Sequence, residues 1–237
     1  MKTYLSFGGG VNSVAMMLLM LDEGWDFEAV FADTGVERPE TYEYLEMLLS
    51  IGYKITWLKP KSGGFNNLYD YCWNFEMVPP SYGAGRWCSV HFKRTPIMEY
   101  SEKPCFHLLG YDFGEIHRVK ETIEDEVVTR FPLIEHEMTR YNCEQLIESH
   151  GLPLPIKSGC YFCPQQSYAQ WRYLRKAHPD LWCKAVALED RNVAYQMRKG
   201  KTKIKYIDSN GKPLKVIANE AQGELFEEYK PPCYCGR

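Results

Sequence analysis

The residues best suited to do chemistry stand near the start of the chain, in a turn of consecutive glycines from Gly8 to Gly10. Glycine lets a ligand approach the backbone closely, because no Cβ atom intervenes. An apolar helical pattern follows the turn, and the first N–H groups of a helix have no partners inside that helix. Asn12 and Ser13 add polar side chains at the helix start. The segment predicts a phosphate site, with a flexible strand-to-helix connection as the alternative.

A second polar motif, formed by Asp33, Thr34 and Gly35, follows the next apolar run of the sequence. Pro39 and an acidic first turn come after it, and both are typical of a helix start. The motif therefore stands one crossover after the glycine turn, at the end of a strand. It is interpreted as a ligand contact, and a well-formed loop is the alternative.

Cys160 and Cys163 form a Cys-x-x-Cys pair followed directly by proline. Two thiolates at this spacing can bind one metal, but zinc and a 4Fe-4S cluster each require about four ligands. Cys233 and Cys235 can supply more, because a chain end is free to fold back over the surface. An all-thiolate set suits iron–sulfur and zinc alike, and a redox dithiol is a third option. Four other cysteines are expected to be small hydrophobic residues: Cys72, Cys105, Cys143 and Cys183.

Basic residues occur in two groups. Lys93, Arg94 and Arg118 can each neutralise phosphate oxygens, although each alone is equally typical of a solvated surface charge. The second group is interleaved with aromatic residues and is compatible with a tRNA or DNA contact, or with a solvated face above a buried tryptophan. It comprises Arg172, Arg175, Lys176, Arg198, Lys199, Lys201, Lys203 and Lys205, with Trp171, Tyr173 and Tyr195 between them.

Composition narrows the class of protein. The chain has 237 residues, of which 45% are hydrophobic and 25% charged, as expected for a globular protein with ample core. No apolar run approaches the ~20 residues of a membrane span, and the start of the chain lacks a secretory pattern, so we expect a cytoplasmic protein that does not enter membranes. The net charge of −3 excludes a strong global attraction to nucleic acid. Nine cysteines without an export signal favour metal or thiol chemistry over disulfides.

The elements that must position these residues alternate along the first half of the chain. Strands separated by helices predict crossover units, a mostly parallel twisted α/β sheet, and ligands at the carboxyl ends of its strands. The expected strands are residues 3–7, 27–32, 54–58, 105–109 and 127–131, and the expected helices are residues 12–24 and 40–52. Residues 59–87 are interpreted as a lid over the pocket, or else an irregular loop. We expect one domain over residues 1–151 and a helical, cysteine-containing module over residues 152–237, which packs on the first domain.

The glycine turn resembles the PP-loop of the adenine nucleotide alpha-hydrolase superfamily, whose usual form is Ser-Gly-Gly-x-Asp-Ser. Gly8 stands at the position of the first serine, Asn12 stands at that of the aspartate, and Ser13 matches. The Asp-Thr-Gly motif resembles the phosphoadenosine phosphosulfate (PAPS) reductase branch. So do the basic segment after Cys88 and the segment that begins at Gly110. The resemblance implies a Rossmann-like sheet of the HUP and PP-loop type, with helices on both faces.

The resemblance also implies roles for individual residues. Lys93, Arg94, Glu115 and Arg118 are expected to act on the phosphates. Cys88, Cys160 and Cys163 are expected to bind a 4Fe-4S cluster with Cys235, or with Cys233 as the alternative fourth ligand, and zinc is the alternative metal. The expected nucleotide contacts are Ser6, Gly8, Gly9, Gly10, Asn12, Ser13, Asp33, Thr34, Gly35 and Gly110.

Three functions from different classes follow. The first is an ATP-using enzyme that, with Mg²⁺, adenylates an acceptor for sulfur transfer. The second is a sulfonucleotide reductase that releases sulfite from PAPS or APS through a cysteine nucleophile. The third is a non-catalytic nucleotide-binding protein with a structural zinc. Besides the nucleotide, the candidate partners are a sulfur- or electron-donor protein, a tRNA or DNA acceptor, and a second copy of the chain in a homodimer.

Overall fold

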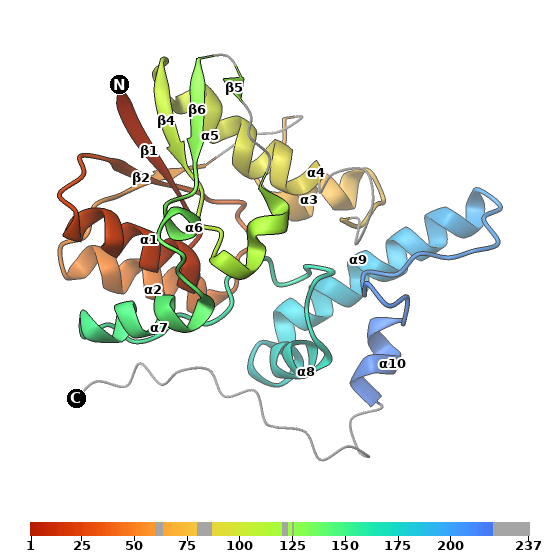
Figure 1. The fold of residues 1–237 in the computed structure, drawn as a ribbon. Coiled ribbons are helices and arrows are strands. Elements are labelled where there is room, and N and C mark those ends of the chain that lie inside the picture. Colours follow the sequence, from red (N-terminus) through yellow and green to blue (C-terminus); the bar gives the residue numbers. More distant parts are fainter. Residues whose placement is uncertain (60–63, 80–86, 120–122, 125, 220–237) are drawn as a thin grey trace.

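The computed structural model describes residues 1–59, 64–79, 87–119, 123–124 and 126–219. Its centre is a six-stranded sheet in the order β3-β2-β1-β4-β6-β5 (Figure 1). All neighbouring strands are parallel except β5, which pairs antiparallel with β6. The strands are β1 (Lys2–Phe7), β2 (Glu28–Ala32), β3 (Ile55–Leu58), β4 (Cys105–Leu108), β5 (Ile123–Glu124) and β6 (Val127–Arg130).

The expected strands and crossovers are confirmed, with boundaries shifted by one or two residues. Strand β1 pairs with β2 on one side and with β4 on the other, so Leu5 lies between Ala29 and Leu108. Such a central strand is covered on both faces, which explains why Tyr4, Leu5 and Phe7 are all buried. Strand β5 was not anticipated, because two residues carry no readable alternation.

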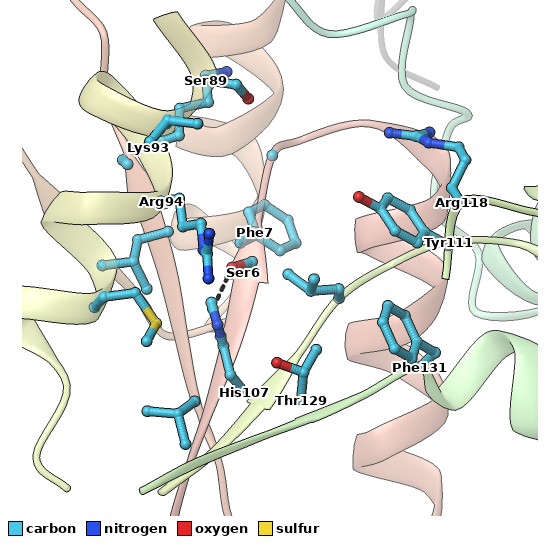
Figure 2. A pocket seen from close by; sticks show the side chains of 17 residues that line it. Ser6, Phe7, Ser89, Lys93, Arg94, His107, Tyr111, Arg118, Thr129 and Phe131 are labelled. Atoms are coloured by element: carbon cyan, nitrogen blue, oxygen red, sulfur yellow. Dashed lines mark hydrogen bonds between the residues drawn. The ribbon is translucent and has the colours of Figure 1, made fainter. Parts of the chain in front are cut away.

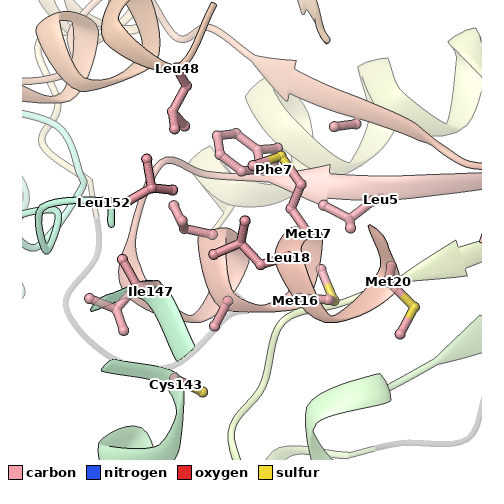
Figure 3. Close-up of a cluster of buried hydrophobic side chains, with 14 of the residues drawn as sticks. Leu5, Phe7, Met16, Met17, Leu18, Met20, Leu48, Cys143, Ile147 and Leu152 are labelled. Atoms are coloured by element: carbon pink, nitrogen blue, oxygen red, sulfur yellow. The ribbon is translucent and has the colours of Figure 1, made fainter. Parts of the chain in front are cut away.

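One face of the sheet is covered by α1 (Val11–Asp22), α2 (Pro39–Ser50) and α7 (Arg140–Ser149). Their apolar side chains meet those of β1 and β2 in the largest hydrophobic cluster, where Met17 and Leu18 of α1 lie near Phe7 and Ile147 (Figure 3). The short helix α6 (Pro132–Glu135) leads into α7. Helix α7 was not expected from the sequence, although Thr139 caps its start by accepting the N–H of Asn142.

The opposite face is covered by the π-helix η2 (Val90–Arg94) and α5 (Thr95–Tyr100), which follow the short α4 (Trp87–Ser89). Ile97 of α5 packs there on Tyr4, Val30 and Val127. Helices on both faces of a mostly parallel sheet confirm the expected α/β class.

Helices α8 (Tyr168–Ala177), α9 (Pro179–Arg198) and α10 (Leu214–Asn219) lie to one side of the sheet (Figure 1). Trp171 of α8 is fully buried in their cluster, which also takes in Leu68 of α3 (Leu68–Asn74) and Phe92 of η2. This confirms a helical C-terminal part, and the division of the chain into two domains at residue 152 stays a prediction. No helix in the described ranges has the length and apolar character needed to span a membrane.

Candidate functional site

The glycine turn connects β1 directly to α1. Gly9 has a φ of +68°, which favours glycine, and a Cβ atom there would lie 2.8 Å from Leu45 Cδ1. The N–H of Gly10 donates to Ser13 Oγ at 3.2 Å, and that hydroxyl donates to the Gly10 carbonyl at 2.9 Å. The first intrahelical bond is made by the N–H of Val14, so the amides of the preceding helical residues point out of the helix end. Amides at a helix start can bind an anion, and phosphate binding at this turn stays a prediction.

The turn stands at a topological switch point of the sheet. From β1 the chain adds β2 and β3 on one side, then crosses to β4 on the other. Ligands of open parallel sheets bind at such a point. Gly110, just after β4, approaches α1 so closely that a Cβ atom would lie 3.2 Å from the carbonyl of Asn12. This contact explains the requirement for glycine at position 110.

A cavity of about 560 Å³ opens at this switch point, on the face covered by η2 and α5. Its volume is within the usual range of small-molecule sites. Figure 2 shows cationic side chains on opposite walls, with Lys93 and Arg94 on one helix and Arg118 across the gap. The lining residues are Ser6, Phe7, Gly8, Ala32, Ser89, Val90, Lys93, Arg94, Ile97, Met98, His107, Leu109, Tyr111, Arg118, Val127, Thr129 and Phe131.

The three cations differ in their surroundings. Lys93 Nζ donates to Glu37 Oε1 at 2.8 Å, and the Glu37 side chain is fully buried. Burial by itself lowers the pKa of the Lys93 amine, but the Glu37 carboxylate and Cys160 raise it by more, so the amine stays charged. Arg118 pairs with Glu115 and lies 4.2 Å from the centre of the Tyr111 ring, which places it by charge and by stacking. Arg94 faces the cavity beside His107 (Figure 2).

A histidine that the sequence analysis did not single out lies at the centre of the cavity. His107 Nε2 lies 2.6 Å from Ser6 Oγ, so two neighbouring strands present a hydrogen-bonded polar pair (Figure 2). Burial, and next the charge of Arg94, lower the pKa of His107 to about 4, so its imidazole is neutral at pH 7. Ser6, His107 and Thr129 each follow an apolar residue near the carboxyl end of their strand, and this signal was readable.

Asn12 belongs to a polar cluster at the mouth of the turn. Its Nδ2 donates to Asp112 at 3.0 Å and to Glu115 at 3.1 Å, while Arg140 donates to its Oδ1 at 3.3 Å. An aspartate at position 12 would bring a third carboxylate to this cluster. The neighbours therefore account for an amide at the position where the PP-loop pattern has an acid.

The Asp-Thr-Gly motif lies beside the cavity rather than along its wall. Asp33 Oδ1 accepts the N–H of Gly35 and the hydroxyl of Tyr42, both at 2.7 Å. Thr34 Oγ1 donates to Glu37 at 3.1 Å, and Gly35, with a φ of +72°, packs against Asn67. These bonds shape the end of β2. Nucleotide contact by the motif stays a prediction, with Ala32 the residue of this strand that lines the cavity.

The first part of the chain, from β1 to just beyond β3, is similar to a known protein family. A family model described as "Phosphoadenosine phosphosulfate reductase domain" matches residues 2–65. This stretch resembles a PAPS reductase domain. The match runs from β1 to just beyond β3 and includes both the glycine turn and the Asp-Thr-Gly motif. It confirms the resemblance over these residues.

Among solved structures, a phosphoadenylyl-sulfate (PAPS) reductase from Candida auris in a phosphate complex is similar, with a TM-score of 0.47 and 15% identity. The alignment covers 65% of this chain and 75% of that chain. Similarity this low carries no functional inference. No curated protein sequence matches the chain.

The cysteine pair lies beyond the stretch that resembles the PAPS reductase domain, next to Glu37. The N–H of Cys163 donates to the Cys160 carbonyl at 3.0 Å, which closes a tight turn between the two cysteines. An isolated antiparallel β-bridge pairs the backbone of Cys160 with that of Glu37, so the turn is attached to the loop after β2. Cys160 Sγ lies 3.7 Å from Thr34 Oγ1.

Burial raises the pKa of the Cys160, Cys163 and Cys88 thiols, and Cys88 and Cys160 both pack against the hydrophobic cluster of the C-terminal helices. Within the part of the chain that the structure describes, however, no three His, Cys, Asp or Glu side chains are arranged as a metal site. Cys233 and Cys235 lie outside the described residues. The donors are of the right kind for a thiolate-bound metal, but the described set is incomplete, so the ligand set stays a prediction.

The expected lid is only partly within the described ranges, since residues 60–63 and 80–86 are not described. Its described part forms α3, which packs against α9 in the C-terminal cluster. No residue of α3 lines the cavity at the glycine turn. Of the other expected buried cysteines, Cys72, Cys105 and Cys143 are buried as predicted, whereas Cys183 is exposed on α9, and that prediction was wrong.

Proposed function

We propose that this protein is an enzyme that binds an adenine nucleotide, ATP in preference to PAPS, in the cavity at the switch point and acts at its phosphates. The observation that carries this proposal is one cavity lined by the glycine turn and by three cationic side chains, Lys93, Arg94 and Arg118. A polyanion fits such a lining, and the similarity of residues 2–65 to a PAPS reductase domain supports an adenine nucleotide as its source.

The parts of the cavity suggest how the nucleotide is oriented. The phosphates would lie at Gly8 and the start of α1, where amides and cations converge. The base would lie toward the apolar wall formed by Ile97, Met98 and Val127. The neutral Ser6 and His107 pair can donate or accept hydrogen bonds between these two ends without adding charge.

The reaction that we propose is adenylation of an acceptor for sulfur transfer. An acceptor oxygen forms a bond to the α-phosphorus while the bond to the pyrophosphate oxygen breaks. A sulfur nucleophile then displaces AMP from the acceptor. Lys93, Arg94 and Arg118 stabilise the charge that accumulates on the phosphate oxygens in the first step. Glu115 orients Arg118 through their ion pair.

The proposal also names the residues that would bind Mg²⁺ and the residues that would bind an iron–sulfur cluster or zinc. Mg²⁺ is usually bound by one or two carboxylates together with substrate phosphates, and Asp112 and Glu115 near Asn12 fit that role. Cys88, Cys160 and Cys163, with Cys235 or Cys233, are proposed to bind a 4Fe-4S cluster, or else zinc. The steps above depend on the cavity residues and on Glu115, which orients Arg118.

The second candidate is a sulfonucleotide reductase, which the description of the matching family favours. In that reaction a cysteine thiolate attacks the sulfur of the bound sulfonucleotide, the bond from that sulfur to the phosphate oxygen breaks, and the adenosine phosphate leaves. A thiol donor then attacks the sulfur of the cysteine in the enzyme-bound S-sulfonate, which releases sulfite and leaves a disulfide. The phosphate-binding role of the cavity would be the same. The candidate nucleophiles, Cys233 and Cys235, lie in the part of the chain that is not described.

Calorimetric titration of the anaerobically purified protein with ATP and with PAPS tests the proposal. Gly8→Val tests the cavity without disturbing the fold. Gly8 lines the cavity, and a new Cβ atom there would lie 3.9 Å from Ser13 Oγ, its nearest contact beyond the neighbouring residues. We expect it to keep its fold and to bind ATP at least ~10-fold more weakly, a loss of about 1.4 kcal/mol. Arg94→Gln should weaken binding similarly, and Lys201→Gln, an exposed cation outside the cavity, should not.

The products then separate the candidate reactions. Pyrophosphate release from ATP supports adenylation, and sulfite release from PAPS with a thiol donor supports the reductase. Nucleotide binding without turnover would support the non-catalytic reading. Unchanged ATP affinity in both Gly8→Val and Arg94→Gln would rule out the cavity as the nucleotide site.

A further inference from the structure

A second cavity, of about 480 Å³, lies where the loop after β2 meets α2, α3, the cysteine turn and the start of α9. Its lining includes Gly35, for which the Asp-Thr-Gly motif predicted a nucleotide contact. Its walls carry four carboxylates and three tyrosine rings, with Lys184 as the only lysine or arginine among the lining residues. The acidic residues are Glu37, Glu43, Glu46 and Asp70, and the aromatic ones are Tyr42, Tyr69 and Tyr161.

Glu37 has one carboxylate oxygen without a hydrogen-bond donor. Its Oε1 accepts bonds from Lys93 and Thr34, at 2.8 and 3.1 Å. Its Oε2 is equally buried, yet no donor reaches it among the described residues. An unpaired buried carboxylate oxygen costs roughly 1–3 kcal/mol or more. Because Glu37 also lines the second cavity, a shift of its buried side chain would bring this oxygen within reach of a donor on a ligand there.

The lining indicates the charge of that ligand. Four carboxylates opposite one lysine favour a cation, and tyrosine rings stabilise an organic ammonium or guanidinium group through their faces. A bare metal ion is disfavoured, since the described side chains offer no group of three ligands. The cavity volume suits a small molecule or one residue of a larger one.

The two cavities share one ion pair. Lys93 lines the cavity at the glycine turn, Glu37 lines the second cavity, and their charged groups are 2.8 Å apart. We propose that the second cavity binds the acceptor substrate, and that this acceptor carries a cationic nitrogen that donates to Glu37 Oε2. This inference rests on the proposed function for the identity of the occupant as the acceptor. It places the acceptor one ion pair away from the phosphates.

Binding of 1,4-diaminobutane tests the site, with 1,4-butanediol as the neutral probe of the same length. At low ionic strength we expect saturable binding of the diamine, followed by NMR shifts of residues around Tyr69 and Tyr161, and no binding of the diol. Glu37→Gln removes the negative charge and should weaken diamine binding at least ~10-fold. Glu99→Gln, an exposed carboxylate that lines neither cavity, is the matched control and should bind as the wild type does.

Glu37→Gln can also disturb Lys93, so a second variant keeps the test independent of that pair. Glu43→Gln changes an exposed residue of α2 at the cavity wall and should weaken diamine binding several-fold while the melting temperature stays the same. Equal binding of the diol, no diamine binding by the wild type, or affinity unchanged in both variants would overturn the proposal. So would loss of bound iron in Glu37→Gln with unchanged diamine affinity, which would assign Glu37 to the cysteine turn.

ATP titration of the same samples separates the two proposals. Diamine binding that survives in a protein without ATP affinity would contradict the proposed function and leave the cation site standing. ATP binding without diamine binding would contradict the cation site and leave the proposed function standing.

Discussion

The imidazole of His107 and the hydroxyl of Ser6 lie 2.6 Å apart on neighbouring central strands, inside a cavity that also receives Arg94. His107 is 5% exposed, so protonation would bury a positive charge next to this arginine. The pair therefore keeps the centre of the cavity polar but uncharged at neutral pH. The positive charges that can neutralise phosphates lie on the cavity walls instead, on Lys93, Arg94 and Arg118.

The first prediction concerns stability against pH. The pKa of His107 is about 4 in the folded protein and 6.5 ordinarily, so between these values the unfolded chain binds the proton more readily. The free energy of unfolding should fall as pH decreases from 6.5 to about 4, by up to about 3 kcal/mol from this group, and should level off below. Urea unfolding across this range measures the slope. His107→Gln should flatten it, whereas an equal slope in that variant and in the exposed control His117→Gln would contradict the assignment.

The second prediction concerns Asn12, whose amide donates to Asp112 and Glu115. Asn12→Asp replaces this donor with a third carboxylate and should destabilise the protein by about 1–3 kcal/mol in the presence of EDTA. Asn12→Ala loses the same hydrogen bonds without adding charge, so it should be more stable than the aspartate variant. Thermal unfolding of both variants provides the comparison, and an aspartate variant as stable as the alanine variant would contradict repulsion at this cluster.

The third prediction separates two costs at Gly9. In Gly9→Val the new side chain meets Leu45, at 2.8 Å from its Cβ atom, and the residue must also adopt a positive φ. Gly24→Val has a similar φ of +71° but no atom within 4 Å, so it incurs backbone strain alone. We expect Gly9→Val to be less stable than Gly24→Val by roughly 1–3 kcal/mol and to lose nucleotide binding. Retained ATP affinity in Gly9→Val would count against the turn as the phosphate site.

The fourth prediction concerns the metal. Cys160→Ala should abolish bound iron, or zinc, in anaerobically purified protein, measured by elemental analysis and by absorbance of the cluster. Cys183→Ala is the matched control, because its thiol is exposed on α9 and is not in the predicted ligand set. Full metal content in Cys160→Ala would remove Cys160 from the ligand set.

Local patterns of the sequence determined the elements of the sheet. Apolar runs separated by helical stretches predicted the five parallel strands, because covered strands and amphipathic helices have different periodicities. The three glycines before α1 predicted the turn between β1 and that helix, since no other residue type combines the positive φ of Gly9 with its close packing on α2. These features depend on neighbours in the chain, so the chain alone reveals them.

Tertiary packing decided which side chains face each other. Ser6 and His107 are 101 residues apart, and their contact exists because β4 crosses over to pair with β1. Lys93 was expected at the phosphates, but its charge is shared with Glu37, a residue that the sequence analysis did not single out. Asp33 was expected at the nucleotide, yet its carboxylate also holds Tyr42 and the backbone of its own loop. Strand order and helix packing bring these residues within hydrogen-bond distance of partners that are far away in the sequence. Local sequence patterns do not determine strand order or helix packing, so they cannot predict these contacts.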